Sequence, residues 1–173
     1  PTLFPPMLRA VMRHPAMLLY LDNASSIGPS SPIGRKSHHG LNENLARECL
    51  ELHTLSPLAG YTQADVTSFA AILTGWSVDM KAEQPGFTFK EKTHEPGIKT
   101  LLGQSFAQGE EGGIHALHFL GTHQATYQHI ATQLVRHFIT DNPTSQDVQH
   151  IATILQNTGG NLQTASIALA DLY

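Results

Sequence analysis

The run from Leu41 to Leu55 limits the fold more than any other stretch, because it combines an apolar stripe with a dense set of polar side chains. The stripe consists of leucines at helical spacing: Leu41, Leu45, Leu52 and Leu55. Polar side chains three or four positions apart share a neighbouring face, namely Asn44, Arg47, Glu48 and Glu51. The run predicts a helix that Asn42 caps, that Ser56-Pro57 ends, and that holds a rigid polar constellation.

Apolar residues at helical spacing continue over most of the chain. Prolines 5 and 6 start a helix that Pro15 is expected to kink or split. Thr62, followed three residues later by Asp65, resembles a capping box at the start of a helix that Gly75 ends. Further helices are predicted after Gly112-Gly113, over 125–139, from Asn142-Pro143 to 155, and over 162–172. Short links make neighbouring helices antiparallel.

Residues 76–106 follow a different pattern. The segments 76–78 and 87–89 alternate apolar and polar residues, and they flank Gln84-Pro85-Gly86, which predicts a small hairpin. Residues 24–40 are rich in Ser, Gly and Pro and predict a long polar loop. The expected fold is therefore mainly α, an irregular multi-helix bundle with one small β-hairpin insertion around 76–106. Residues 1–173 are expected to form a single helical domain.

The composition argues against several classes of protein. The net charge is −4, and the ten Lys and Arg residues are scattered, so no nucleic-acid partner is expected. No apolar run approaches the roughly 18 residues that a membrane span needs, and the opening residues lack the features of a signal peptide. The single cysteine, Cys49, excludes an internal disulfide and suits a small buried hydrophobe. Nothing in the sequence requires a cofactor.

The polar constellation has three interpretations. Glu48, Glu51 and His53 are candidate metal ligands that His94 could complete, although His53 points away from the two carboxylates. Alternatively, the same region is a small-ligand or enzyme site around Glu48, Glu51 and His94. The preferred interpretation is a structural network, in which Arg47 pairs with a glutamate, Lys99 pairs with Glu48 or Glu51, and Asn44 caps the loop at 92–99.

Histidine is frequent, with 11 residues, but the histidines other than His53 and His94 are weaker candidates for a functional site. His115 and His118 are three apart on one predicted helix, with His123 shortly after them, and such a set could share a metal ion. The usual His-Glu-x-x-His arrangement is absent, so solvated or capping histidines are the preferred interpretation.

The motif Asn42-Glu43-Asn44-x-Ala46-Arg47-Glu48-x-x-Glu51-Leu52-His53-Thr54-Leu55 resembles the hallmark of a bacterial family known as domain of unknown function 1800. Further segments strengthen the resemblance, namely 14–22, 60–66 continuing to 73–76, 87–89 followed by 94–103, and Arg136-His137-Phe138. The resemblance covers nearly the whole chain. Two positions depart from the pattern, since Cys49 stands where leucine is usual and Ser56-Pro57 replaces a glycine.

The resemblance implies a predominantly helical protein, but it supplies no activity. Members of the family are often exported and longer than this chain, which would then be their C-terminal portion. A periplasmic or extracellular location is implied, with the N-terminal part of the same chain or another exported protein as the partner. Whether the protein is an enzyme stays open.

Two functional hypotheses follow from these observations. The first is a scaffold or interaction module with a buried Asn/Arg/Glu/His network, and it predicts that Glu48→Ala destabilises the fold strongly. The second is a metal- or ligand-binding domain or enzyme, in which the same change would leave folding largely intact.

Overall fold

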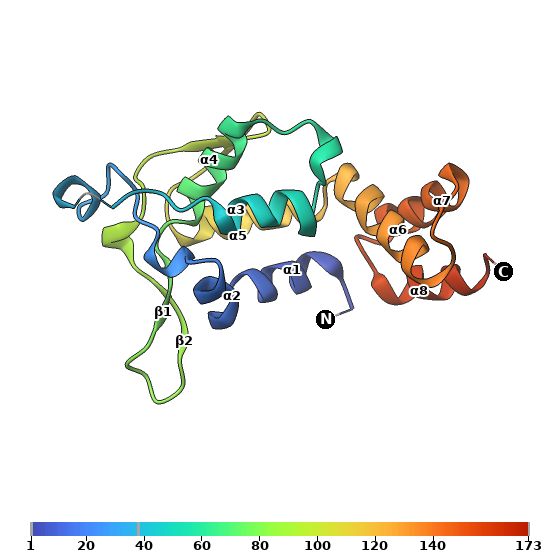
Figure 1. The fold of residues 1–173 in the computed structure, drawn as a ribbon, viewed down its shortest axis with the longest axis horizontal. Helices are drawn as coiled ribbons and strands as arrows, with labels where there is room; N and C mark the ends of the chain where they lie inside the picture. Colours follow the sequence, from blue (N-terminus) through green and yellow to red (C-terminus); the bar gives the residue numbers. More distant parts are fainter. Residues whose placement is uncertain (1, 38, 173) are drawn as a thin grey trace.

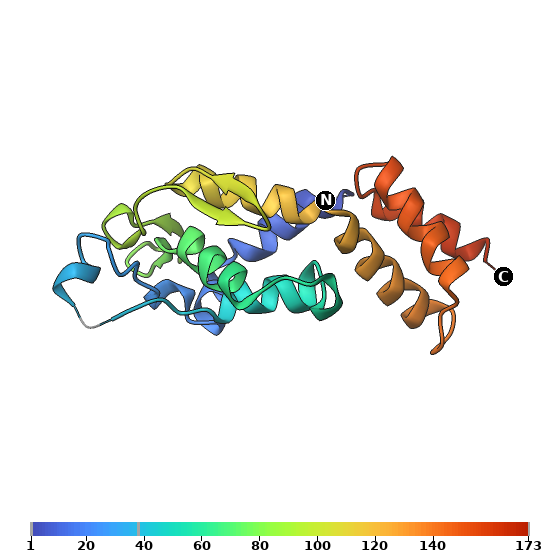
Figure 2. The same cartoon turned by 90° about the horizontal axis from the view of Figure 1, so that it is seen from above.

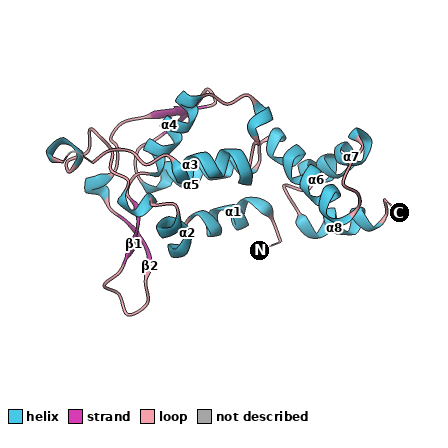
Figure 3. Cartoon of the chain, viewed as in Figure 1, coloured by secondary structure: helices cyan, strands magenta, loops and turns pink. Residues whose placement is uncertain are grey.

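The computed structural model describes residues 2–37 and 39–172, and in this part of the chain it contains eight α-helices and two small antiparallel sheets (Figures 1 and 3). The helices are α1 (Phe4–Met12), α2 (Pro15–Tyr20), α3 (Asn44–Glu48), α4 (Gln63–Leu73), α5 (Glu110–Gly121), α6 (Gln124–Phe138), α7 (Ser145–Asn157) and α8 (Leu162–Ala170). This confirms the prediction of a mainly α fold with a small β insertion. None of the described helices is long and apolar enough to cross a membrane.

Some helix boundaries have the chemistry that the sequence predicted. Pro15 separates α1 from α2. Thr62 and Asp65 form the predicted capping box, with the Thr62 side chain accepting from the Asp65 N–H and the Asp65 side chain accepting from the Thr62 N–H. The cap of α3 is Glu43 rather than Asn42, so that prediction was wrong by one residue, although the Asn42 side chain does accept a hydrogen bond from the Asn44 N–H.

Two other helices begin away from their predicted positions. The Asn142-Pro143 prediction was wrong by two residues, because Thr144 caps α7 and its side chain accepts from the Asp147 N–H. The glycine pair lies inside α5 rather than before it. A Cβ on Gly112 would lie 1.9 Å from the Ala107 carbonyl oxygen, and one on Gly113 would lie 2.5 Å from the Trp76 ring. Lack of room for a Cβ therefore explains these two glycines better than a helix boundary does.

The β structure comprises two hairpins where the sequence predicted one. Strands β1 (Trp76–Asp79) and β2 (Gly86–Phe89) pair in the register Trp76↔Phe89, which confirms the predicted hairpin. Strands β3 (Lys99–Leu101) and β4 (Gln104–Phe106) form a second antiparallel pair. Its two-residue turn places Leu102 and Gly103 at φ +50° and +76°, a backbone typical of tight hairpins.

The buried apolar residues form two cores, and the molecule is elongated (Figure 2). The larger core lies among α1–α5 and the hairpins, which we call the body, and the smaller one lies among α6, α7 and α8, which we call the lobe. At their junction the Phe4 N–H donates to the Gly160 carbonyl at 2.9 Å, and the Leu162 N–H donates to the Thr2 carbonyl at 2.9 Å. Ile130 packs against both cores.

The predicted loop over 24–40 contains two short 3₁₀ turns, Asn23–Ser25 and Gly34–Lys36. It lies against another 3₁₀ turn, Glu91–Thr93, and the residues around it. The Gly28 N–H donates to the Thr93 carbonyl at 2.9 Å, and the Ile33 N–H donates to the Lys92 carbonyl at 3.1 Å. Backbone hydrogen bonds therefore hold the loop against residues 92 and 93.

Candidate functional site

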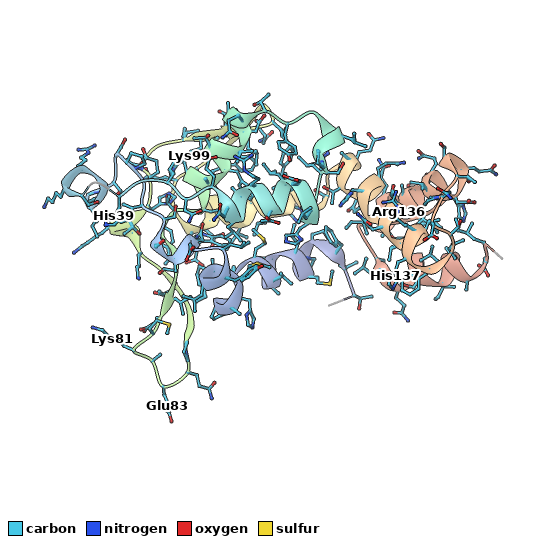
Figure 4. All side chains as sticks on the ribbon, in the orientation of Figure 1. His39, Lys81, Glu83, Lys99, Arg136 and His137 are labelled. Carbon is cyan, nitrogen blue, oxygen red and sulfur yellow. The ribbon has the colours of Figure 1, made fainter. Side chains whose placement is uncertain are left out.

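The side chains that the sequence suggested as one polar network lie in two separate places. His94 and Lys99 are buried in the body, where β3 packs against α4, and Figure 4 shows Lys99 beside that helix. Asn44, which is exposed, and Arg47 lie on α3. Among the described residues, neither His94 nor Lys99 forms a hydrogen bond or salt bridge with a side chain between 44 and 53.

His94 lies at the centre of the buried group, and its contacts define its tautomer. Its Nδ1 is 2.7 Å from the Thr74 carbonyl oxygen, so Nδ1 carries the proton and donates it. Its Nε2 then accepts the Gly109 N–H at 2.8 Å. Burial lowers the pKa of His94, the hydrogen bond to Thr74 opposes this shift, and the positive charge of Lys99 adds to it. The imidazole is therefore held neutral.

Lys99 contacts His94 rather than the carboxylates that the sequence suggested for it. Its Nζ lies 3.2 Å from the His94 Nε2 and also donates to the Glu95 carbonyl oxygen. Within the described residues it makes no salt bridge. Burial lowers the pKa of Lys99, while the charge of Glu95 opposes the shift. Lys99 thus occupies a tight place between a neutral ring and a backbone carbonyl.

Thr74 completes this group, and the sequence analysis did not identify it. Its hydroxyl donates to the Ala71 carbonyl at 2.7 Å and accepts the Glu95 N–H at 2.8 Å. The sequence feature that could have identified Thr74 is its position at the end of a capped helix, directly before Gly75. Gly75 has φ +85°, and a Cβ there would collide with the Phe89 ring. We call His94, Lys99, Thr74 and the Gly109 amide the polar knot. It joins three segments that are distant in the sequence, namely the end of α4 at Thr74, residues 94–99, and Gly109.

Arg47 belongs to a second group at the surface. Its Nη2 donates to Glu43 at 2.9 Å and to Gln63 at 3.0 Å, and Thr67 donates to the same Glu43 carboxylate at 2.6 Å. Hydrogen bonds from Thr67 and Gln63, with the charge of Arg47, lower the pKa of Glu43. The Arg47 side chain is 42% exposed. We call these residues the surface network, and the glutamate in it is neither Glu48 nor Glu51.

The remaining metal candidates do not gather around an ion-sized space. Glu48, Glu51 and His53 are half-buried on one helical segment, and His94 lies apart from them in the knot. Burial lowers the pKa of His53, while the charge of Glu48 opposes this shift. Over residues 2–37 and 39–172, no group of three His, Cys, Asp or Glu side chains is placed to hold a metal ion.

The end of the motif helix has an unusual backbone. After α3, residues Cys49–His53 form a π-helical turn, η3. The Thr54 hydroxyl donates to the Cys49 carbonyl at 2.7 Å. Ser56 follows at φ +69° and ψ 159°, a conformation that glycine adopts readily and other residues avoid. This explains the glycine that the family resemblance places here.

Cys49 and the other histidines have structural surroundings. Cys49 is buried, and burial raises the pKa of its thiol. His123 caps α6, since its Nδ1 accepts the Ala125 N–H. His129 lies 3.1 Å from the Leu52 carbonyl oxygen. His115 and His118 are exposed on α5 and line a recess beside α1.

A groove between α1 and α2 is lined almost wholly by apolar side chains. Its volume is about 490 Å³, and its walls are Met7, Ala10, Val11, His14, Ala16, Met17 and Tyr20. The Nδ1 of His14 already accepts the Ala16 N–H. Tyr20 is 82% exposed and Val11 is 42% exposed. Exposed apolar side chains that gather around a groove are typical of interaction surfaces.

The family described as "Protein of unknown function (DUF1800)" matches residues 3–171. The chain belongs to this family. The match confirms the resemblance inferred from the motif at 42–55, and it extends over the body and the lobe alike. No curated protein and no solved structure gives a significant match. In the structure, the DUF1800 motif forms α3, which carries Arg47 of the surface network, and the π-helical turn that follows it.

Proposed function

We propose that this DUF1800 chain is a helical interaction module whose docking surface is the groove between α1 and α2. The lining of the groove carries the proposal, because it is apolar apart from the Tyr20 hydroxyl and one histidine, His14, whose Nδ1 is already engaged. A charged or strongly polar side chain entering such a groove would lose its hydration without gaining a partner. The occupant is therefore the apolar face of a helix in a partner protein.

The shape of the surface supports this occupant. The groove lies between two consecutive helices and has a volume of about 490 Å³, enough for a few large aliphatic or aromatic side chains. Two methionines, Met7 and Met17, line it. Methionine is flexible and polarizable, and it is over-represented on surfaces that accept varied apolar partners. Tyr20 at the rim supplies a rigid ring with a polar tip, as interface tyrosines often do.

The polar knot has a supporting role in this proposal. Its imidazole, its threonine hydroxyl and its ammonium group are each engaged by neighbouring atoms of the same chain. A buried and satisfied network makes a region rigid. We therefore interpret His94 and Lys99 as structural cross-links and place recognition at α1 and α2. We do not propose a metal site or an enzyme site around Glu48, Glu51 and His94.

The location of the protein belongs to the same proposal. From the family resemblance, we infer a bacterial protein that acts in the periplasm or outside the cell, where the partner helix would also be exported. Fractionation of the bacterial host with an antibody against this chain tests the inference, and recovery of the protein only from the cytoplasm contradicts it.

The docking surface is tested with a displayed library of 15-residue amphipathic helices whose apolar positions are varied. We expect selected peptides to carry large apolar residues at helical spacing. We also expect Ala10→Gln to weaken their binding at least tenfold, because the longer side chain fills the groove while glutamine is nearly as good a helix former as alanine.

The matched control is Ala64→Gln, which makes the same change at an exposed position of α4 outside the groove. Circular dichroism and thermal unfolding establish that both variants fold. Unchanged peptide binding by Ala10→Gln, or selection of peptides without apolar residues, contradicts the proposal. Concentration-dependent dimers that Ala10→Gln abolishes would instead identify a second copy of the chain as the occupant.

A further inference from the structure

A second hollow lies where the body meets the lobe. It has a volume of about 540 Å³ and is bounded by the start of α1, one face of α5 and the turn between α7 and α8. The backbone around it is well tied, because Leu3 and Asn161 form an isolated antiparallel bridge and the Phe4 N–H donates to the Gly160 carbonyl. A Cβ on Gly121 of α5 would lie 3.1 Å from Pro5, which shows how closely the two helices approach. The walls are therefore formed by firmly held elements.

Polar side chains enter this recess without partners. Arg9 comes from α1, and Glu111, His115 and His118 come from successive turns of α5. Within the described part of the chain, the side chains of these four residues make no hydrogen bond or salt bridge. By contrast Arg13, one turn after Arg9 on α1, pairs with Glu110 and stacks on the Phe87 ring at 3.9 Å. The recess thus contains hydrogen-bond donors that the fold itself leaves free.

The rest of the lining is apolar. Leu3, Pro5, Pro6 and Ile114 form most of it, together with Gly159 and with Thr122, whose hydroxyl donates to the His118 carbonyl. Pockets of this composition, largely apolar with a few convergent polar groups, are typical of sites for small organic ligands. The apolar part suits a hydrocarbon body, and the guanidinium suits a carboxylate, which it can bind through two parallel hydrogen bonds.

We propose that this recess binds a small carboxylic acid with an apolar body, with Arg9 as the main contact to the carboxylate and His115 and His118 as additional donors. Glu111 lines the same recess and offsets the charge of Arg9, which disfavours dianions such as phosphate. A ligand with one negative charge is therefore preferred. Because the recess is bounded by both the body and the turn between α7 and α8, the bound ligand stabilises their junction.

The probe is octanoate, titrated into the chain by isothermal calorimetry and by NMR of the histidine rings. We expect saturable binding that shifts the ring signals of His115 and His118 and leaves those of His150, an exposed histidine of α7 outside the recess, unchanged. Octanol and inorganic phosphate serve as comparison ligands. Each of them lacks one half of the proposed recognition, so each is expected to bind at least tenfold more weakly than octanoate.

Two substitutions predict opposite effects. Arg9→Gln is expected to weaken octanoate binding about tenfold, whereas Glu111→Gln is expected to tighten it several-fold by removing a repulsive charge. Arg35→Gln is the matched control, because Arg35 is exposed on a distant turn. Equal affinity for octanol overturns the carboxylate assignment. Weaker octanoate binding by Glu111→Gln contradicts the preference for a singly charged ligand. An unchanged octanoate affinity of Arg9→Gln contradicts the assignment of this recess as the binding site.

Discussion

The polar knot and the surface network are both groups of hydrogen-bonded polar residues, yet they occupy opposite environments. His94 and Lys99 are 6% and 8% exposed, whereas the Arg47 side chain is 42% exposed. In the knot a polar atom that loses its partner finds no water to replace it, so each bond is costly to break. In the surface network water can replace a lost partner, and an ion pair there contributes little. Burial, rather than residue type or spacing, decides which polar motif holds a fold together.

The largest effect is expected for His94→Ala. The change leaves the buried Thr74 carbonyl and the partly buried Gly109 N–H without their partner. At roughly 1–3 kcal/mol for each unsatisfied group, we expect a loss of about 3 kcal/mol in the free energy of unfolding, measured with urea. His150→Ala is the control, because His150 is exposed on α7, and it should change stability by less than about 0.5 kcal/mol. Similar losses for both variants would remove the distinction between buried and exposed groups.

The knot should also make stability depend on pH. The pKa values of His94 and His53 are lowered in the folded state by burial. Below the unfolded pKa of about 6.5, the unfolded chain therefore takes up protons that the folded chain does not. The stabilisation is complete above that pH and is lost as the pH falls. We expect urea unfolding to show decreasing stability from pH 7.5 to pH 5, with a shallower decrease in His94→Gln. An identical slope in that variant would show that the knot does not contribute.

A gain in stability is expected for Ser56→Gly at the end of the motif helix. Ser56 occupies φ +69° and ψ 159°, which costs a non-glycine residue roughly 1–3 kcal/mol. Part of the relief is offset by the greater freedom of glycine in the unfolded chain, so we expect a gain of about 1 kcal/mol. Ser105→Gly in β4, where φ is not positive, is the control and should lower stability. A loss at both positions would argue against strain at Ser56.

A small effect is expected for Arg47→Gln in the surface network. The Arg47–Glu43 pair is an i,i+4 ion pair with side chains 42% and 28% exposed, and such pairs are worth less than about 1 kcal/mol. The remaining loss should shrink further at high salt, because ions screen exposed charges. Urea unfolding at low and high salt measures both quantities. A loss as large as that of His94→Ala would mean that the network, not the knot, carries the fold.

The smallest effect is expected for Glu48→Ala, which reverses the expectation from the sequence. That expectation assumed that Glu48 neutralises Arg47 or Lys99, but those residues contact Glu43 and His94 instead. Glu48 is half-buried, and in the described part of the chain its side chain makes no hydrogen bond or salt bridge. We expect a change within about 0.5 kcal/mol in thermal unfolding. A loss of several kcal/mol would restore the original network.

Local chemistry made much of the fold predictable. The capping box at Thr62, the helix break at Pro15 and the alternation around Trp76 depend on neighbouring residues, and the structure has all three. The knot depends on three segments that meet only in the folded chain, so spacing could not reveal that His94 contacts Thr74 and Gly109. The start of α5 was predicted wrongly from Gly112-Gly113, because these glycines are explained by close contacts rather than by a helix boundary. A Cβ on Gly113 would collide with the Trp76 ring, and one on Gly112 with the Ala107 carbonyl. Contacts between polar side chains that are far apart in the sequence could therefore not be predicted from residue spacing.

The most direct test of this account is the protonation state of His94, read from the ¹⁵N chemical shifts of its imidazole at pH 6. An ordinary histidine is largely protonated at this pH. We expect a neutral ring with the proton on Nδ1, because Nδ1 donates to the Thr74 carbonyl and Nε2 accepts the Gly109 N–H. A positively charged ring, or a neutral ring with its proton on Nε2, would contradict the polar knot.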